Sequence, residues 1–225
     1  IKLDIDLDAL KDLPEAIKAQ IPTEQSKENV LKFHPTASLY TNFSKEENED
    51  IDYESEEEDV QIQIQVGNPD CAYFYDVNER AAVESQEFFG KKFLVEDAKP
   101  RKWKIGKETK EILGYICQKA TATSTDDELI EAWFTSKIPV EVGPSSFQGL
   151  PGAILSVRVK DGNYEIVATK VVFEKIDRTE IVAHTKGKKV TKEKFKTIVD
   201  AKQQEMIEEY GGDGNMIIKT ETIER

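Results

Sequence analysis

The chain has 225 residues, of which 38% are hydrophobic and 33% are charged, and its formal net charge is −13. This hydrophobic share suffices for a buried core, as in globular proteins. The negative charge repels nucleic-acid phosphates and anionic lipid surfaces, and no apolar run approaches the ~20 residues that a membrane-spanning helix requires. We therefore expect no nucleic-acid partner and no transmembrane segment.

The chain opens without methionine on the alternating apolar residues Ile1, Leu3, Ile5 and Leu7. This period of two is typical of a half-buried strand. A start inside a strand-like pattern predicts that a segment preceded it, and an N-terminal targeting segment is the natural candidate.

The first half of the chain alternates between predicted strands and one short helix. The helix is expected from Asp12, a capping residue, to the stop at Pro22. The acidic run from Glu46 to Asp59 cannot be buried as a group, so a mobile, solvated loop is expected at about 44–59. No calcium-loop pattern occurs there. Strands are predicted at 30–33, 38–43, 60–66 and 73–75.

The second half is richer in strands and ends with one longer helix. A hairpin is expected around Phe89-Gly90-Lys91, and a long hairpin around Asp161-Gly162-Asn163. Thr191 is a suitable N-cap for a helix over 191–210, which Gly211-Gly212 would end. Strands are predicted at 81–87, 88–95, 103–105, 114–123, 128–135, 153–159, 164–176 and 216–222.

These elements predict a mainly β (α+β) protein that forms a single domain over residues 1–225. Hairpins outnumber crossovers, so we expect one curved antiparallel sheet or half-barrel. Two or three helices, including the helix near 191–210, would cover its apolar face.

A decapeptide rich in glycine and proline lies between two of the predicted strands. Glycine reaches positive φ and proline fixes φ, so Leu150-Pro151-Gly152 predicts a type II turn with Pro151 and Gly152 central. We expect the decapeptide to form a rigid corner, whose turn-forming residues are Gly143, Pro144, Gly149, Pro151 and Gly152.

Several further motifs accompany this corner in a fixed order. Trp-Lys-Ile at 103–105 precedes Gly-Tyr-x-Cys-x-Lys-Ala at 114–120 and Ala-Trp-Phe-Thr at 132–135. Ile138-Pro139, Gly143-Pro144 and Phe147 then lead to Gly149-Leu150-Pro151-Gly152-Ala153-Ile154-Leu155.

This series resembles the GLPGLI family of exported Bacteroidota proteins, over about Trp103–Phe173 and more faintly over Val60–Val95. Ala153 departs from the leucine of the family name, which changes a packing partner and leaves the turn intact. The resemblance implies export to the periplasm or to the inner side of the outer membrane. It implies no particular activity.

The chain contains two cysteines, Cys71 and Cys117, so the one disulfide that can form within it joins them. The alternative is that each is buried as a small apolar residue. Two histidines and two cysteines without zinc-type spacing predict no metal site, and we expect no cofactor.

Aromatic residues beside the corner could line a ligand recess. Rings and apolar side chains with a few polar groups are typical of ligand clefts, although an ordinary core is the competing interpretation. Such a recess could accept a lipid tail, a peptide or a haem-like plane. The candidate ligand-binding residues are Trp133, Phe134, Phe147, Leu150 and Ile154.

We therefore expect an exported, non-enzymatic binding or accessory protein of the periplasm or outer membrane. Its partner would be an apolar small molecule, a peptide or an outer-membrane protein. The alternative is a serine-type hydrolase of peptides or esters that uses Ser145 or Ser146 with His34 or His184, although no Gly-x-Ser-x-Gly elbow is present. A third interpretation is a structural subunit whose acidic loop contacts basic partners.

Overall fold

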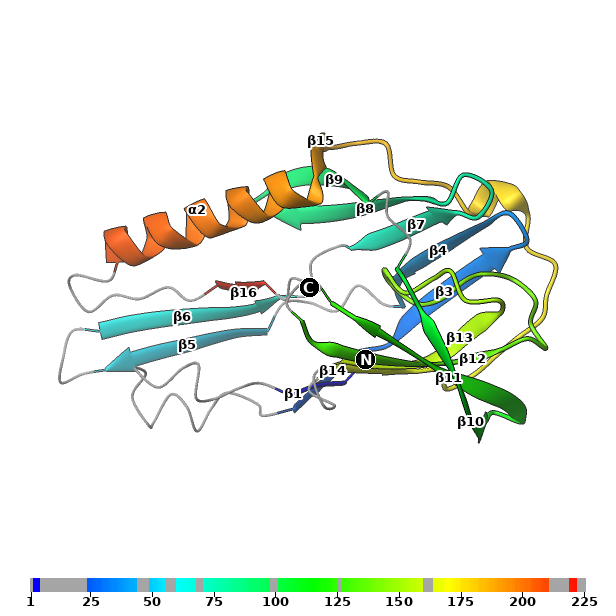
Figure 1. The fold of residues 1–225 in the computed structure, drawn as a ribbon. Coiled ribbons are helices and arrows are strands. Elements are labelled where there is room, and N and C mark those ends of the chain that lie inside the picture. The colour runs from blue at the N-terminus through cyan, green and yellow to red at the C-terminus, as the bar shows by residue number, and fades with distance from the viewer. Residues whose placement is uncertain are drawn as a thin grey trace. The chain divides into compact units, whose positions relative to one another are not determined.

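The computed structural model describes residues 2–4, 24–43, 49–55, 60–67, 71–97, 101–124, 127–159, 164–210 and 219–221 (Figure 1). The chain divides into two compact units. Unit 1 comprises residues 1–43, 73–82 and 98–183, and unit 2 comprises residues 44–72, 83–97 and 184–225. The helix predicted at 12–22 lies outside the described residues, and the prediction of a single domain stays a prediction.

An antiparallel sheet of five consecutive strands forms the largest part of unit 1 (Figure 1). The strands β1 (Lys2–Asp4) and β2 (Glu24–Ser26) continue it beyond β14. Its five strands in order are β10 (Lys104–Ile112), β11 (Tyr115–Thr123), β12 (Leu129–Thr135), β13 (Ala153–Val159) and β14 (Tyr164–Val167).

This sheet carries apolar residues on both of its faces because side chains alternate along each strand. On β12, Ile130, Ala132 and Phe134 belong to one buried cluster, which Val157 of β13 also joins. The intervening Trp133 packs instead against a second cluster that contains Cys117, Leu155 and Ile138. Both faces are therefore covered by protein.

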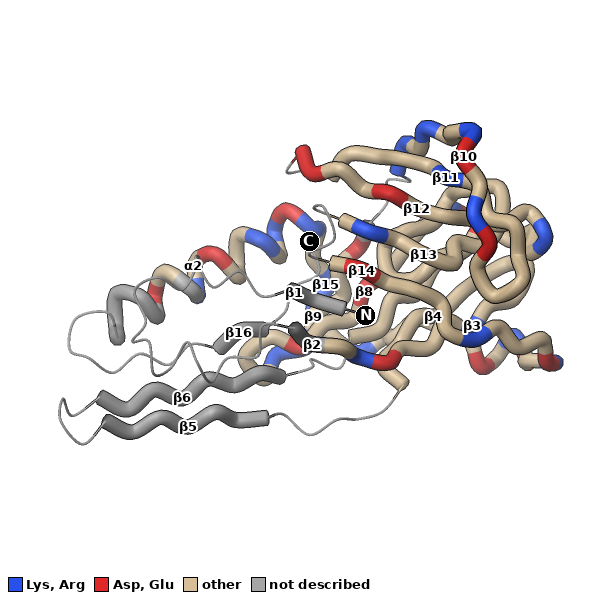
Figure 2. The backbone as a smooth tube through the Cα atoms, turned by 90° about the horizontal axis from the view of Figure 1, so that it is seen from below, with Lys and Arg blue, Asp and Glu red and all other residues tan. Residues whose placement is uncertain are grey.

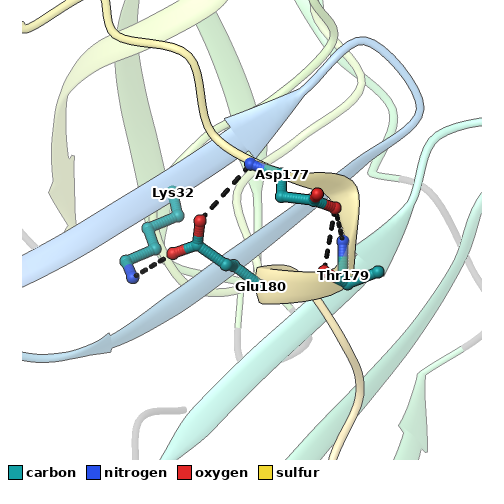
Figure 3. A network of polar contacts seen from close by, with 4 residues as sticks. All are labelled: Lys32, Asp177, Thr179 and Glu180. Atoms are coloured by element: carbon teal, nitrogen blue, oxygen red, sulfur yellow. Dashed lines mark hydrogen bonds and ion pairs between the residues drawn. The ribbon is translucent and has the colours of Figure 1, made fainter.

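The hairpin of β3 (Asn29–His34) and β4 (Ala37–Asn42) is also part of unit 1, as is most of β7 (Ala72–Asp76). A single 3-10 turn, η3 (Arg178–Glu180), is attached to β3 through an ion pair between Lys32 and Glu180, 3.6 Å long (Figure 3). Asp177 caps this turn by accepting hydrogen bonds from the backbone and hydroxyl of Thr179 at 2.9 and 2.8 Å. These bonds hold the pKa of Asp177 below its usual value.

Three tyrosines form a separate buried cluster in unit 1. Tyr40 lies on β4, and Tyr73 and Tyr75 lie two residues apart on β7, where the alternation of a strand places them on one face. Tyr75 is 2% exposed, and its hydroxyl has no hydrogen-bond partner among the residues with described side chains. Burial is the main cause that raises the pKa of Tyr75, and the Glu141 carboxylate adds to it.

Unit 2 contains a hairpin, a parallel strand and the α-helix. Most of β8 (Ala81–Phe88) and all of β9 (Lys91–Asp97) join through Phe89 and Gly90, whose φ values of 48° and 68° suit a type I′ turn. β15 (Lys188–Thr191) pairs with β9 in parallel and leads directly into α2 (Lys192–Tyr210). The remaining strands are β5 (Glu49–Ser55), β6 (Val60–Gly67) and β16 (Lys219–Glu221).

α2 buries one side against the hairpin of unit 2. Phe195 and Val199 recur at a helical spacing of four and pack on Phe88, Phe93 and Val95. The ring of Phe195 meets those of Phe93 and Phe88 edge-on, with centroids 5.2 and 6.1 Å apart. The helix predicted at 191–210 is thereby confirmed.

The prediction of a single sheet covered by two or three helices is wrong. A six-stranded sheet with the order β15-β9-β8-β7-β4-β3 is present besides the seven-stranded sheet that contains β10 to β14, and β16, β6 and β5 form a third, small sheet. α2 is the one α-helix within the described ranges. The error arose from the assumption that only one sheet face is apolar, whereas β11, β12 and β13 bury side chains on both faces.

Three local predictions also need correction. The strand expected at 164–176 ends at Val167, and the residues that follow have no regular secondary structure up to η3. The loop expected at 44–59 includes a strand, because β5 pairs with β6 along its length. The pair of β15 with β9 is parallel, so the fold is not purely antiparallel.

We expect Tyr75→Phe to raise the free energy of unfolding at pH 7 by about 1–2 kcal/mol, since it removes a buried hydroxyl that lacks a partner. The folded protein keeps the Tyr75 proton that the unfolded chain releases near pH 10, so wild-type stability falls as the pH rises through the raised pKa. Urea unfolding at pH 7 and above pH 10 measures both effects. Destabilisation at pH 7 would mean that the hydroxyl is hydrogen-bonded.

We expect Phe195→Ala to lower the free energy of unfolding of unit 2 by about 3–5 kcal/mol, because it removes a packed ring from a closed cluster. Lys196→Ala at the adjacent exposed position is the control and should change it by less than about 0.5 kcal/mol. Urea unfolding followed by circular dichroism measures both. Equal effects in the two variants would contradict the packing of α2.

Candidate functional site

The corner from Gly143 to Gly152 connects β12 and β13, which are antiparallel neighbours. It is a buried part of unit 1, since Phe147, Gln148 and Leu150 are exposed by only 3%, 7% and 1%. A backbone bond closes the corner at its base, where Ile154 donates to the Val142 carbonyl at 2.9 Å. The segment therefore forms a buried connection between neighbouring strands, and a role for its turn residues stays a prediction.

The type of the turn differs from the prediction. A type II turn would join the Ala153 amide to the Leu150 carbonyl, but this amide donates to Ile138 at 3.0 Å. The Gly152 amide donates to Leu150 at 2.7 Å instead, which closes a three-residue γ-turn about Pro151. The Ala153 amide is thereby bonded to the segment that follows β12 and takes no part in the turn.

Two glycines of the corner are required by close backbone approach. A Cβ on Gly152, whose φ is +151°, would collide with the Thr135 carbonyl oxygen at the end of β12. A Cβ on Gly143 would collide with the Phe147 carbonyl oxygen and would lie 3.0 Å from Ile154 Cδ1. Gly149 has φ +92° and open space around it, so its need for glycine is conformational.

Three side chains from other segments of unit 1 hold the corner in place. Trp103 donates from Nε1 to the Gln148 carbonyl at 2.9 Å, and Gln148 Nε2 donates to the Tyr73 hydroxyl at 2.8 Å. Arg101 donates to Ser146 Oγ at 3.3 Å and lies 5.0 Å above the centre of the Phe147 ring. The Trp-Lys-Ile motif that contains Trp103 was recognisable in the sequence, but no motif or spacing indicated that Arg101 or Tyr73 would contact the corner.

The candidate ligand-binding residues are not all brought together. Four of them, Phe134, Phe147, Leu150 and Ile154, are at most 3% exposed and pack in one cluster. Trp133 lies on the opposite face of β12, because consecutive strand residues point in opposite directions. Ligand binding by this set stays a prediction, and the packing of these four side chains against one another favours a core role.

The Trp133 ring is flanked by charged side chains. Lys110 Nζ lies 4.4 Å above the ring centre, and Lys119 Nζ lies 5.9 Å from it. Lys119 also bonds to Glu131 at 2.5 Å, which raises the pKa of the lysine. Burial lowers the pKa of Lys110. Because Lys110 covers the ring, a planar ligand could stack there only after this side chain moved.

The contacts of the candidate nucleophiles and bases do not assemble a hydrolase site. Ser145 is 3% exposed with φ 47°, and Ser146 accepts the bond from Arg101. His34 Nδ1 lies 3.1 Å from the Thr36 hydroxyl. His184 in unit 2 lies 3.0 Å from the Ser85 hydroxyl, a pair that sequence reasoning missed because 99 residues separate its members.

The Ser85 and His184 pair lacks the surroundings of a catalytic dyad. Ser85 is 6% exposed, so a substrate would have little access to its hydroxyl. The neighbouring Glu84 bonds to Gln86 and accepts from the Cys71 thiol at 3.5 Å. The Glu84 carboxylate therefore contacts Gln86 and Cys71, and no described contact joins a carboxylate to His184.

Neither cysteine takes part in a disulfide, so the bridge that the sequence allows is not formed. Cys117 is fully buried, and its thiol lies 3.5 Å from the Tyr115 carbonyl. Burial is the main cause that raises the pKa of Cys117, which keeps the thiol protonated and unreactive.

Within the described side chains, no group of three or more His, Cys, Asp and Glu could hold a metal ion. None of the described helices is long and apolar enough to cross a membrane.

We expect Gly152→Ala to lower the free energy of unfolding by about 3 kcal/mol or more, because Cβ would displace the end of β12. Gly149→Ala is the matched control, with a positive φ but free space, and should cost about 1–2 kcal/mol. Urea unfolding compares the two. Equal losses would mean that positive φ alone, and not the contact with Thr135, requires glycine at 152.

Two comparisons with known proteins agree on one similarity. The family model described as "N-glycanase peptide, N-terminal domain" matches residues 40–202, which is more than half of the chain. Two solved structures of PNGF-II, in space groups C2 and P21, have TM-scores of 0.56 and 0.55 and sequence identities of 16% and 17%. A search of curated proteins found no match.

Each similarity to PNGF-II covers 79% of this chain but 30% of the solved chain, so this chain spans less than a third of those relatives' length. At these identities the likeness shows the fold alone. The resemblance to the GLPGLI family stays a prediction. The family match over residues 40–202 shows that the chain belongs to the family of N-terminal domains of N-glycanase peptide.

Proposed function

We propose that this chain is a non-enzymatic accessory domain that binds glycoproteins for a protein that processes N-linked glycans. One observation carries the proposal: the family that matches residues 40–202 is described as an N-terminal domain of N-glycanase peptide. The fold of this chain resembles 30% of the PNGF-II chain, which fits the role of one domain beside the larger part of such a protein.

The geometry around the corner supports a role other than catalysis. Its serines are buried or bonded to Arg101, and the histidines bond to Thr36 and Ser85. A general base must lie within hydrogen-bonding reach of its nucleophile. The serine hydrolase alternative gains no support from these contacts, since the Ser85 hydroxyl that does meet a histidine is enclosed.

The proposal includes export to the periplasm or the outer membrane. Its support is the resemblance of the motifs at 103–105, 114–120, 132–135 and 149–155 to exported GLPGLI proteins. The partner is then a glycoprotein or a glycan-bearing protein of the outer membrane, rather than an apolar small molecule.

The test uses the purified chain and a glycoprotein that carries neutral, high-mannose N-linked glycans. We expect the chain to bind this glycoprotein at least about tenfold more tightly than its deglycosylated form, because the glycan supplies the recognised groups. Biolayer interferometry measures the affinities, and mass spectrometry of the glycoprotein after incubation measures glycan release. Release of glycan by the chain would contradict the non-enzymatic role.

Equal affinity for the two glycoprotein forms would contradict the binding role. A fluorophosphonate probe labels reactive serines and so tests the serine hydrolase alternative. We expect no labelling of the chain. If the probe labelled the chain, loss of labelling in Ser85→Ala or in Ser146→Ala would identify the nucleophile and overturn the proposal.

A further inference from the structure

The sheet of β10 to β14 in unit 1 gathers charged side chains around one indole ring. Residues paired directly across antiparallel strands point to the same face, as do alternate residues of one strand. Lys119 is paired with Trp133. Arg158 is paired with Glu131 on one side and with Glu165 on the other, and in Figure 2 the blue segment of β13 lies beside the red segment of β14. We call this part of the sheet the Trp133 face, and it consists of Lys110, Lys119, Glu131, Trp133, Arg158 and Glu165.

The Trp133 face reaches solvent on one side of the ring. The buried cluster that contains Cys117 packs against the other side. Away from that cluster, the side chains of Lys119 and Glu131 are 19% and 27% exposed, and that of Arg158 is 50% exposed. Trp133 is itself half-buried, so its ring lies at the boundary between core and solvent.

The two tryptophans of the chain differ in how their indole N–H groups are used. Trp103 donates to the Gln148 carbonyl at 2.9 Å and so helps to hold the corner. In the part of the chain that the structure describes, Trp133 Nε1 donates no hydrogen bond, and it is not among the enclosed polar atoms that lack a partner. A buried indole N–H usually has a partner, so packing alone does not explain why this position carries tryptophan.

Lys110 lies over the Trp133 ring without an ion pair. Its Nζ is 4.4 Å from the ring centre, and it forms no ion pair with any carboxylate whose side chain is described. Burial is the main cause that lowers the pKa of Lys110, and the Arg158 guanidinium adds to it. The charged ammonium therefore loses hydration here, and a ligand that returned it to water would relieve that cost.

The other charges beside the ring are paired within the sheet. Lys119 bonds to Glu131 at 2.5 Å and lies 3.5 Å from Glu108. Arg158 bonds to Glu165 at 3.1 Å. Cross-strand pairs of this kind stabilise a sheet, so by themselves they indicate no ligand. Next to an accessible ring they also supply fixed donors and acceptors with little net charge, which suits a neutral polar ligand better than an ion.

We infer that the Trp133 face binds a pyranose ring of a neutral glycan. A pyranose has a face of C–H groups that packs on an indole, and its rim carries hydroxyls that both donate and accept hydrogen bonds. Lys119 and Glu131 are the polar groups nearest to the ring that can bind those hydroxyls, and Lys110 moves off the ring when the sugar stacks. The choice of glycan rests on the proposed function, and the stacking argument does not.

The first test measures binding of the whole chain to the high-mannose oligosaccharide freed from its glycoprotein. Trp133→Leu keeps an apolar side chain against the buried cluster and should weaken binding at least about tenfold, because it removes the stacking surface. Titration with the sugar should change the tryptophan fluorescence of the wild type and not that of the variant, which retains Trp103. Urea unfolding establishes that the variant is folded.

The second test removes the side chain that covers the ring. Lys110→Ala should bind the oligosaccharide about threefold more tightly or better, because no lysine has to be displaced. Lys107→Ala is the matched control, an exposed lysine on the same strand whose loss changes the net charge equally, and it should leave the affinity unchanged.

A decrease in affinity for Lys110→Ala, or equal effects of the two lysine variants, would overturn the inference. Wild-type affinity in a folded Trp133→Leu would overturn it as well. If Trp133→Leu does not fold, the comparison of Lys110→Ala with Lys107→Ala decides.

The two proposals fail separately. If the high-mannose glycoprotein binds the wild type and Trp133→Leu equally, the inference is wrong and the proposed function stands. If a dextran oligosaccharide binds through Trp133 and the glycoprotein does not bind, the Trp133 face is established and the proposed recognition of N-linked glycans is wrong. If neither saccharide binds, both proposals are wrong.

Discussion

The structure of unit 1 depends on the close backbone contact between Gly152 and the end of β12. Because no Cβ separates Gly152 from the Thr135 carbonyl, the chain can return from the corner directly into β13. Leu150 and Phe147 are then carried into the cluster on one face of the sheet, where Leu150 is 1% exposed. A short glycine-proline segment thus both joins two strands and supplies core side chains.

This dual role bears on function. A segment that is rich in glycine and serine and flanked by aromatic residues has the composition of a ligand loop, yet most of its residues are buried and its polar groups bond within unit 1. The corner therefore contributes to the core of unit 1.

Several features could be predicted because they are local. The alternation of 60–66 and 128–135, the Phe89-Gly90 turn and the spacing of Phe195 and Val199 each reflect one strand or helix period. Alternation also separates Trp133 from Phe134, so the division of the proposed ligand set was present in the sequence. The γ-turn at Pro151 was not, because it depends on whether Ala153 bonds to Leu150 or to Ile138.

The sequence by itself determined the β-rich character, the terminal helix and the position of the corner, since short-range periodicity and backbone restriction act within a few residues. Only the tertiary structure decided that there are separate sheets, that both faces of the larger antiparallel sheet are buried, and that β15 lies parallel to β9. It also decided that Lys188 lies opposite Phe93, a pairing that joins segments separated by most of a hundred residues of sequence. The pairing of strands that are distant in sequence depends on which side chains of all the elements become buried together, and no single segment specifies this.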